Sequence, residues 1–177
     1  MSFISFRALG RDIVERFTDM DGKEPKPGDL IQVFRGILYK HWAVYVGLGN
    51  VVHFGADGSA PGSSLVPASG QKSGVVMEKL KDVVNGDKWK INNYLDKKYK
   101  PRCTNEIVKD ACKLVGSGLE YDVLNYNCEH FATELRYGKP ESRQAYEARA
   151  GFLEGVLEAT GAIIAVAAVA VIGIMKS

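Results

Sequence analysis

The sequence predicts an α+β domain in which a small antiparallel sheet packs with helices, followed by an apolar C-terminal segment. Two patterns lead to this fold class. Short β-branched and aromatic runs separated by turn residues fill residues 30–80, and apolar positions at helical spacing follow from about residue 104. Strands between helices are typical of α+β proteins. With 177 residues, the chain has room for one ordinary domain and its appendages.

The first residues form an extension to this domain. Residues 3–17 carry apolar side chains at helical spacing with charged side chains between them, which predicts a short amphipathic helix. That helix either lies on a membrane surface or docks on the domain. The following DMDGKEPKPGD stretch contains two prolines and two glycines and indicates a linker. We therefore assign residues 1–23 to an amphipathic N-terminal extension and residues 24–140 to the main domain.

Four short strands are expected between residues 30 and 80. The runs LIQVF, HWAVYVG and NVVHF, which begin at Leu30, His41 and Asn50, are bounded by turn residues, a pattern typical of antiparallel strands. GVVMEKL at 74–80 forms a fourth strand, after a loop rich in Gly, Ser and Pro at 55–74.

Two helices follow the strands. Thr104 is expected to cap a helix whose apolar stripe runs to Val115, and Gly116 ends it. Asn127 is expected to cap a second helix that continues through Arg136 and stops near Gly138.

The C-terminal residues have a different composition. Residues 141–158 are assigned to a linker or amphipathic segment. Residues 159–175 form a run of 17 residues without a charge, close to the roughly 17–25 that a membrane-spanning helix needs. A buried core helix is the alternative, but such a helix seldom lacks any polar face. We therefore expect a C-terminal transmembrane helix here, only mildly hydrophobic because of its Ala and Gly content.

Composition narrows the classes of function. The chain has 23 Lys and Arg against 21 Asp and Glu, a balance too even to suggest a nucleic-acid partner. Its cysteines, Cys103, Cys112 and Cys128, match neither a disulfide framework nor a metal motif, which fits reduced thiols in the cytosol. The N-terminus lacks the apolar core of a secretory signal. We expect no metal and no cofactor.

Cys128 differs from the other two cysteines because it falls in the first turn of a predicted helix. Unpaired N–H groups and the helix dipole at that position favour a negative sulfur and could also hold an oxyanion. Cys103 and Cys112 lack this helix-start setting, so a structural role is expected for them. His130 follows Cys128 by two positions and would point away from it on a helix, which favours packing or capping.

His41 and His53 lie in adjacent predicted strands, so the hairpin between them decides whether they share a face. A two-residue loop would pair Val44 with His53 and send the rings to opposite faces. A three-residue loop at residues 47–49 would pair Ala43 with His53 and make the histidines diagonal neighbours on one face. Glycines on both sides of Leu48 make a loop with a left-handed residue and a bulge sterically accessible. Spacing alone leaves a Cys–His site and a purely structural interpretation both open.

The segments KPGDLIQVFR, YKHWAVYVG, VVHF and NCEHFATELRYG resemble the phospholipase A and acyltransferase family, relatives of lecithin:retinol acyltransferase. The similarity covers most of the chain from about Glu24. The resemblance implies a circularly permuted papain-like (NlpC/P60-type) fold, with Cys128 as nucleophile, His41 as general base and His53 as the residue that orients His41. Tyr39 becomes a candidate for oxyanion support.

The resemblance also implies the reaction. A calcium-independent phospholipase A1/A2 would form a thioester acyl-enzyme and pass the acyl group to water, to the amine of phosphatidylethanolamine or to a lysophospholipid. Its partners would be the phospholipid bilayer and glycerophospholipids such as phosphatidylcholine. A local excess of basic residues between Lys72 and Arg102 would attract anionic headgroups or simply be solvated surface.

The expected protein is a monomer on the cytosolic face of intracellular membranes, held by a single-pass C-terminal anchor alongside a soluble pool. The competing functions are a retinol-directed acyltransferase or a cysteine peptidase of the same fold, and a membrane-interaction protein without turnover.

Overall fold

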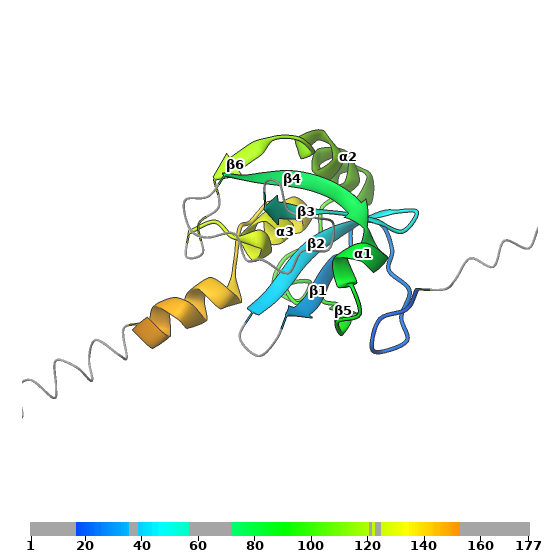
Figure 1. Cartoon of the computed structure of the whole chain (residues 1–177). Helices are drawn as coiled ribbons and strands as arrows, with labels where there is room; N and C mark the ends of the chain where they lie inside the picture. Colours follow the sequence, from blue (N-terminus) through cyan, green and yellow to red (C-terminus); the bar gives the residue numbers. More distant parts are fainter. Residues whose placement is uncertain (1–16, 36–38, 57–71, 121, 123–124, 153–177) are drawn as a thin grey trace, which may run out of the picture.

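A computed structural model of the chain describes residues 17–35, 39–56, 72–120, 122 and 125–152. Helical turns run from residue 143 to 152 and extend away from the sheet, in orange in Figure 1. The labelled elements are, in chain order, β1 (Leu30–Arg35), β2 (Tyr39–Gly47), β3 (Asn50–Ala56), β4 (Lys72–Lys79), α1 (Leu80–Val84), β5 (Trp89–Ile91), α2 (Thr104–Leu114), β6 (Gly118–Glu120) and α3 (Cys128–Tyr137).

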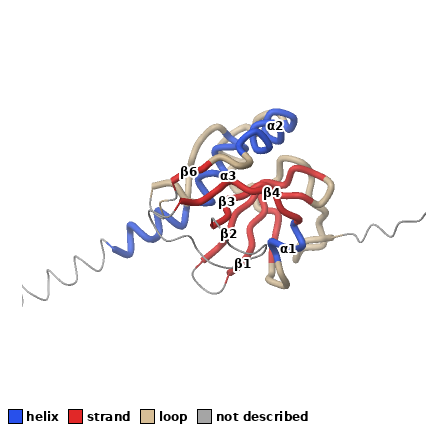
Figure 2. Tube along the Cα trace, turned by 45° about the horizontal axis from the view of Figure 1, so that its top comes forward, coloured by secondary structure: helices blue, strands red, loops and turns tan. Residues whose placement is uncertain are grey.

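The described strands form one antiparallel sheet in the order β5-β1-β2-β3-β4-β6. Figure 2 shows these strands, in red, gathered into a single sheet with helices packed around it. The α+β prediction and the four predicted strands are therefore confirmed. The edge strands β5 and β6 were missed because each has only three residues, too few to display an alternating pattern.

The β2–β3 hairpin has the register that places both histidines on one face. Ala43 pairs with His53, as the three-residue loop predicted. The chain reaches this register differently, because Gly47 pairs with Asn50 across a tighter turn and the register shifts between Tyr45 and Gly47. The extra residue in β2 is a β-bulge, which restores the parity that a two-residue turn alone would reverse.

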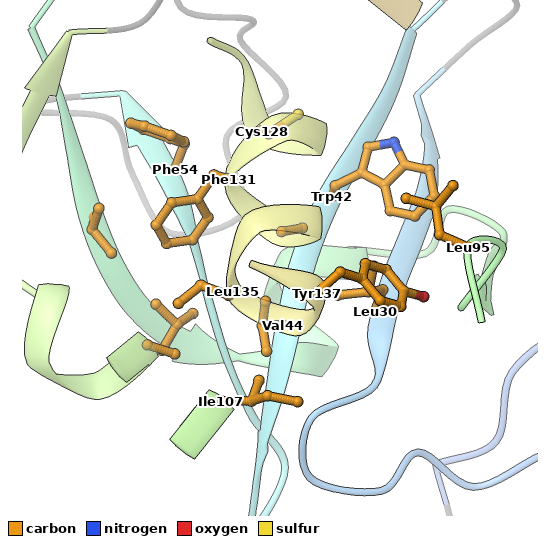
Figure 3. Packing of buried hydrophobic residues seen from close by; sticks show 14 residues of the cluster. Leu30, Trp42, Val44, Phe54, Leu95, Ile107, Cys128, Phe131, Leu135 and Tyr137 are labelled. Carbon is orange, nitrogen blue, oxygen red and sulfur yellow. The ribbon is translucent and has the colours of Figure 1, made fainter. Parts of the chain in front are cut away.

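The sheet has an apolar cluster on each face. One cluster joins α2 and α3 to the central strands, and Figure 3 shows Phe131, Leu135 and Tyr137 of α3 packed between Phe54 and Trp42. The Phe54 and Phe131 rings meet edge to face with centroids 5.0 Å apart. The second cluster joins α1 and β5 to the opposite face and contains Ile31, Val33, Ala43, Val51, Leu80, Val83, Val84 and Trp89.

The two predicted helices are confirmed, with one difference at a cap. Asn127 caps α3, and Gly138 ends it in the left-handed conformation at φ 67°. Thr104 is the first residue of α2 rather than its cap, because the N-cap position belongs to Cys103, whose side chain makes no capping hydrogen bond. Gly116 follows α2 with φ 83°, as expected for a helix stop.

The expected transmembrane helix and single-pass anchor are corrected. No helix within the described residues has the length and apolar composition needed to cross a membrane. Residues 159–175 lie outside those residues, as do the first 14 positions of the amphipathic stretch at 3–17. The expectation rested on an uncharged run at the short end of the spanning range, rich in Ala and Gly, and such a run fixes no helix by itself.

Candidate active site

Cys128 is the first residue of α3 and is fully buried. The helix begins there because the Asn127 side chain accepts hydrogen bonds from the backbone N–H groups of Glu129 and His130, at 3.0 and 3.2 Å. His130 closes the capping box by accepting from the Asn127 N–H at 3.2 Å. His130 therefore has the capping role that its position predicted, and Cys128 stands at the positive end of the helix dipole.

The Asn127 cap also limits which backbone N–H groups could donate to an oxyanion. Two N–H groups of the first turn, those of Glu129 and His130, are already bonded to Asn127. The expectation that first-turn N–H groups in general would be open to a ligand is therefore wrong for these two. The hydroxyl of Tyr39 lies 3.6 Å from the sulfur of Cys128 and so brings a polar side-chain group to the thiol.

His41 and His53 contact each other on the sheet face that carries α1. Nε2 of His41 lies 3.0 Å from Nδ1 of His53, and the rings are perpendicular with centroids 4.9 Å apart. His53 is almost completely buried. Its Nδ1 also lies 2.9 Å from the carbonyl oxygen of Phe54. One proton must lie between the two imidazoles, and its donor depends on their tautomers.

Tyr39 connects the histidine pair with the cysteine. Its hydroxyl lies 3.4 Å from Nδ1 of His41 as well as 3.6 Å from the sulfur of Cys128. The sulfur also approaches the backbone carbonyl of Lys40 at 3.9 Å. Cys128 on α3 and the histidines on the other face of the sheet thus meet at the beginning of β2. The structure brings together all four residues that the sequence singled out.

Gln144 fixes the beginning of β2 from the helix at residues 143–152. Its side-chain oxygen accepts from the Lys40 N–H at 2.9 Å, and its side-chain nitrogen donates to the Lys40 carbonyl at 2.9 Å. The Gln144 backbone N–H donates to the buried carboxylate of Glu129 at 3.0 Å. The sequence offered no signal for this contact. The Gln144 side chain bonds to the Lys40 backbone as a neighbouring strand would, and a single side chain leaves no periodic pattern.

Glu78 is a second residue that sequence reasoning missed. Its carboxylate lies 3.2 Å from Nε2 of His53, on the ring edge away from His41. Glu78 lies two positions beyond Val76, the β4 partner of His53, and so faces the same side of the sheet. Finding it from the sequence would have required the β3–β4 register, which the long loop at 55–74 leaves undetermined.

The electrostatic environment keeps His41 neutral. Burial lowers the pKa of His41 well below its usual value, and the neighbouring His53 and Arg35 lower it further. Arg35 is itself held by Asp87 at 2.5 Å and by the Val83 carbonyl. A neutral imidazole beside a thiol can accept its proton, so the site is suited to general base chemistry at a buried sulfur.

The other two cysteines lie apart from this arrangement. Cys103 and Cys112 are exposed free thiols, the first at the N-cap of α2 and the second within that helix. Cys103 does occupy a helix start, contrary to the expectation, but it is exposed, whereas Cys128 is buried.

Comparisons with known proteins find a matching family model and several similar chains. The lecithin retinol acyltransferase family model matches residues 23–141. Phospholipase A and acyltransferase 4 of Homo sapiens is 41% identical over 145 residues, 80% of this chain and 87% of that protein. Phospholipase A and acyltransferase 3 of Homo sapiens is 41% identical over 157 residues, which cover 87% and 92% of the two chains. Phospholipase A and acyltransferase 1 of Rattus norvegicus is 43% identical over 126 residues, 70% of this chain and 75% of that protein.

Proposed function

The chain belongs to the lecithin retinol acyltransferase family, and from this premise we propose that it is a thiol-dependent phospholipase A1/A2 and acyltransferase. The observation that carries the proposal is the Tyr39 hydroxyl between the sulfur of Cys128 and Nδ1 of His41. Relatives of about 40% identity named phospholipase A and acyltransferase supply the reaction class.

In the first half-reaction, the sulfur of Cys128 attacks the carbonyl carbon of an sn-1 or sn-2 ester. The thiol proton passes to Nδ1 of His41, whose lowered pKa makes it neutral and able to accept. The ester C–O bond then breaks, His41 returns the proton to the departing lysophospholipid oxygen, and the acyl group remains on Cys128 as a thioester.

In the second half-reaction, a new nucleophile attacks the thioester carbonyl and His41 takes its proton. Water gives a free fatty acid, the amine of phosphatidylethanolamine gives an N-acyl product, and a lysophospholipid hydroxyl gives O-acyl transfer. The C–S bond breaks, and the sulfur recovers the proton from His41. All three outcomes therefore use one acyl-enzyme.

Tyr39 is proposed to donate its hydroxyl hydrogen to the developing oxyanion. Its position 3.6 Å from the sulfur of Cys128 supports this role, because the oxyanion forms on the carbon that the sulfur attacks. The occupied N–H groups of Glu129 and His130 strengthen the case for a side-chain donor.

The bilayer is the proposed partner surface. The helix at residues 143–152 exposes Tyr146 and Phe152, which are 75% and 72% accessible, beside Arg143 and Arg149. Aromatic and cationic side chains on one short helix suit the interface between headgroups and acyl chains. Gln144 links the same helix to the beginning of β2, so a membrane contact there would lie close to the reacting thiol.

The test uses phosphatidylcholine vesicles with a different label on each acyl chain, with and without phosphatidylethanolamine. The full chain should release labelled fatty acid and, when the amine is present, form an N-acyl product. Mass spectrometry of quenched protein should find an acyl group on Cys128. Cys128→Ser should lose thioester formation, whereas Cys112→Ser, an exposed control, should retain activity. Failure of the full chain to release or transfer any acyl chain contradicts the proposal.

A further inference from the structure

Three polar side chains form a diagonal line across β2, β3 and β4. Ala43, His53 and Val76 are direct partners in neighbouring strands. His41 lies two residues before Ala43 and Glu78 two residues after Val76, so both share the face of His53 on opposite sides of it. The contacts follow this line, at 3.0 Å from His41 to His53 and 3.2 Å from His53 to Glu78.

With both imidazoles neutral, the geometry leaves two proton arrangements for the histidine pair. In the first, Nε2 of His41 donates to Nδ1 of His53, which leaves Nδ1 of His41 unprotonated beside Tyr39. In the second, Nδ1 of His53 carries the proton and donates to the Phe54 carbonyl at 2.9 Å and toward His41. His41 then carries its own proton on Nδ1, the nitrogen that should receive the proton of the thiol.

We propose that Glu78 selects the first arrangement and is a positioning residue for the base His41. This inference rests on the proposed function only for its effect on catalysis. An ionised carboxylate can only accept, so the contact at 3.2 Å requires a proton on Nε2 of His53. Neutral His53 then has a lone pair on Nδ1, which accepts from Nε2 of His41.

The strengths of the competing bonds favour this arrangement. The Phe54 carbonyl would attract the proton of His53 to Nδ1, but that bond joins two neutral groups. A hydrogen bond to a carboxylate is roughly twice as strong as one between neutral groups. The side chains of His53 and Glu78 are 8% and 21% exposed, so water screens the bond between them only in part. Without Glu78, the Phe54 carbonyl would decide the tautomer, and His41 would present an N–H to the thiol side.

The experiment reads the tautomers directly. Protein labelled with ¹⁵N-histidine is studied at pH 7.5 by long-range ¹H–¹⁵N correlation, with signals assigned through His41→Gln and His53→Asn. In the wild type, His53 should carry its proton on Nε2 and His41 on Nε2. Glu78→Met removes the acceptor while keeping the length of the side chain, and should move the proton of both rings to Nδ1. Glu78→Gln keeps an acceptor oxygen and should give an intermediate result.

Kinetics then measure the consequence for catalysis. Glu78→Met should lower kcat for acyl release by about 10-fold to 100-fold, as is typical when the outer partner of a functional histidine is lost, with KM little changed. Lys79→Met is the matched control, because Lys79 is the next residue of β4, is exposed and faces the other way. It should alter neither the tautomers nor kcat.

Each result decides the inference. A proton on Nδ1 of His53 in the wild type, or tautomers unchanged in Glu78→Met, overturns it whatever the activity. Shifted tautomers with unchanged kcat overturn the catalytic part. If the wild type cleaves no phospholipid, the proposed function fails, while the spectra still decide whether Glu78 sets the tautomers.

Discussion

Nε2 of His41 lies 3.0 Å from Nδ1 of His53 because a β-bulge in β2 compensates for a tight turn. A hairpin with that turn and no bulge would turn one of the rings to the other face of the sheet. The contact between the two imidazoles therefore depends on a backbone irregularity at residues 45–47 as much as on the identity of the histidines.

The first prediction concerns the acceptor at His53. In His53→Asn, the side-chain oxygen can take the place of Nδ1 and accept from Nε2 of His41, whereas His53→Leu offers no acceptor. We expect kcat of the Asn variant to exceed that of the Leu variant by about 10-fold, with similar KM values. Steady-state kinetics on phosphatidylcholine vesicles measure both. Equal loss in the two variants would mean that the hydrogen bond to His41 is irrelevant.

The second prediction concerns the turn that sets this register. Leu48 is 92% exposed and adopts φ 51°, a left-handed conformation that a branched side chain pays for without gaining any packing. Leu48→Asn should raise the free energy of unfolding by about 0.5–1 kcal/mol, because Asn tolerates this conformation better. Urea unfolding measures the change.

The control for the turn is Gly49→Ala. Gly49 has φ 72° and no atom within 4 Å of an added Cβ, so only backbone strain is introduced. The free energy of unfolding of Gly49→Ala should be about 1 kcal/mol lower than that of the wild type. A Leu48→Asn protein no more stable than the wild type would show that the left-handed conformation at this position carries no strain.

How much of the site the sequence could predict differs from residue to residue. The position after Asn127, a strong capping residue, singled out Cys128 among the cysteines, and capping is a local signal. The nucleophile role came only from the family resemblance. A shared face for His41 and His53 was one of the two hairpin registers that parity allowed, and the glycines around Leu48, also a local signal, made it sterically accessible. The sequence did not give the position of the bulge, which lies between Tyr45 and Gly47 rather than in the loop at 47–49, since a three-residue loop and a bulged two-residue turn give the same pairing.

The residues that were missed depend on non-local pairing. Glu78 reaches His53 only through the register of β3 with β4, across a loop whose sequence sets no register. Gln144 reaches Lys40 from 104 positions away. The apolar run at 159–175 led to an incorrect expectation because length and lack of charge are necessary for a spanning helix but do not establish one.

The third prediction concerns acid stability. The folded protein holds the pKa of His41 below the value of about 6.5 that it has when unfolded. Between these two values the unfolded state binds more protons, so the stability from neutral His41 is present above pH 6.5 and is lost as pH falls below it. The wild type should lose about 1 kcal/mol more than His41→Gln between pH 7.5 and 5.5.

Urea unfolding at several pH values measures this difference. His130 also has a lowered pKa, chiefly through burial, so some acid sensitivity should remain in the His41 variant. If the free energy of unfolding changes with pH equally in His41→Gln, His130→Gln and the wild type, neither histidine is the source of the acid sensitivity.

The fourth prediction concerns the exposed aromatic residues of the helix at 143–152. Tyr146 and Phe152 leave most of their surface in water, and moving such rings into an interface removes apolar area worth on the order of 1 kcal/mol each. Tyr146→Ser with Phe152→Ser should therefore weaken partition to phosphatidylcholine vesicles by about 30-fold, measured by sedimentation. Because neither side chain belongs to the Cys128 site, hydrolysis of a soluble short-chain ester should be unchanged.

The matched control is Glu147→Ser. Glu147 is an exposed polar residue of the same helix, between Tyr146 and Phe152, and this variant should partition like the wild type. Equal partition of the double variant and the wild type would place the membrane contact on another surface.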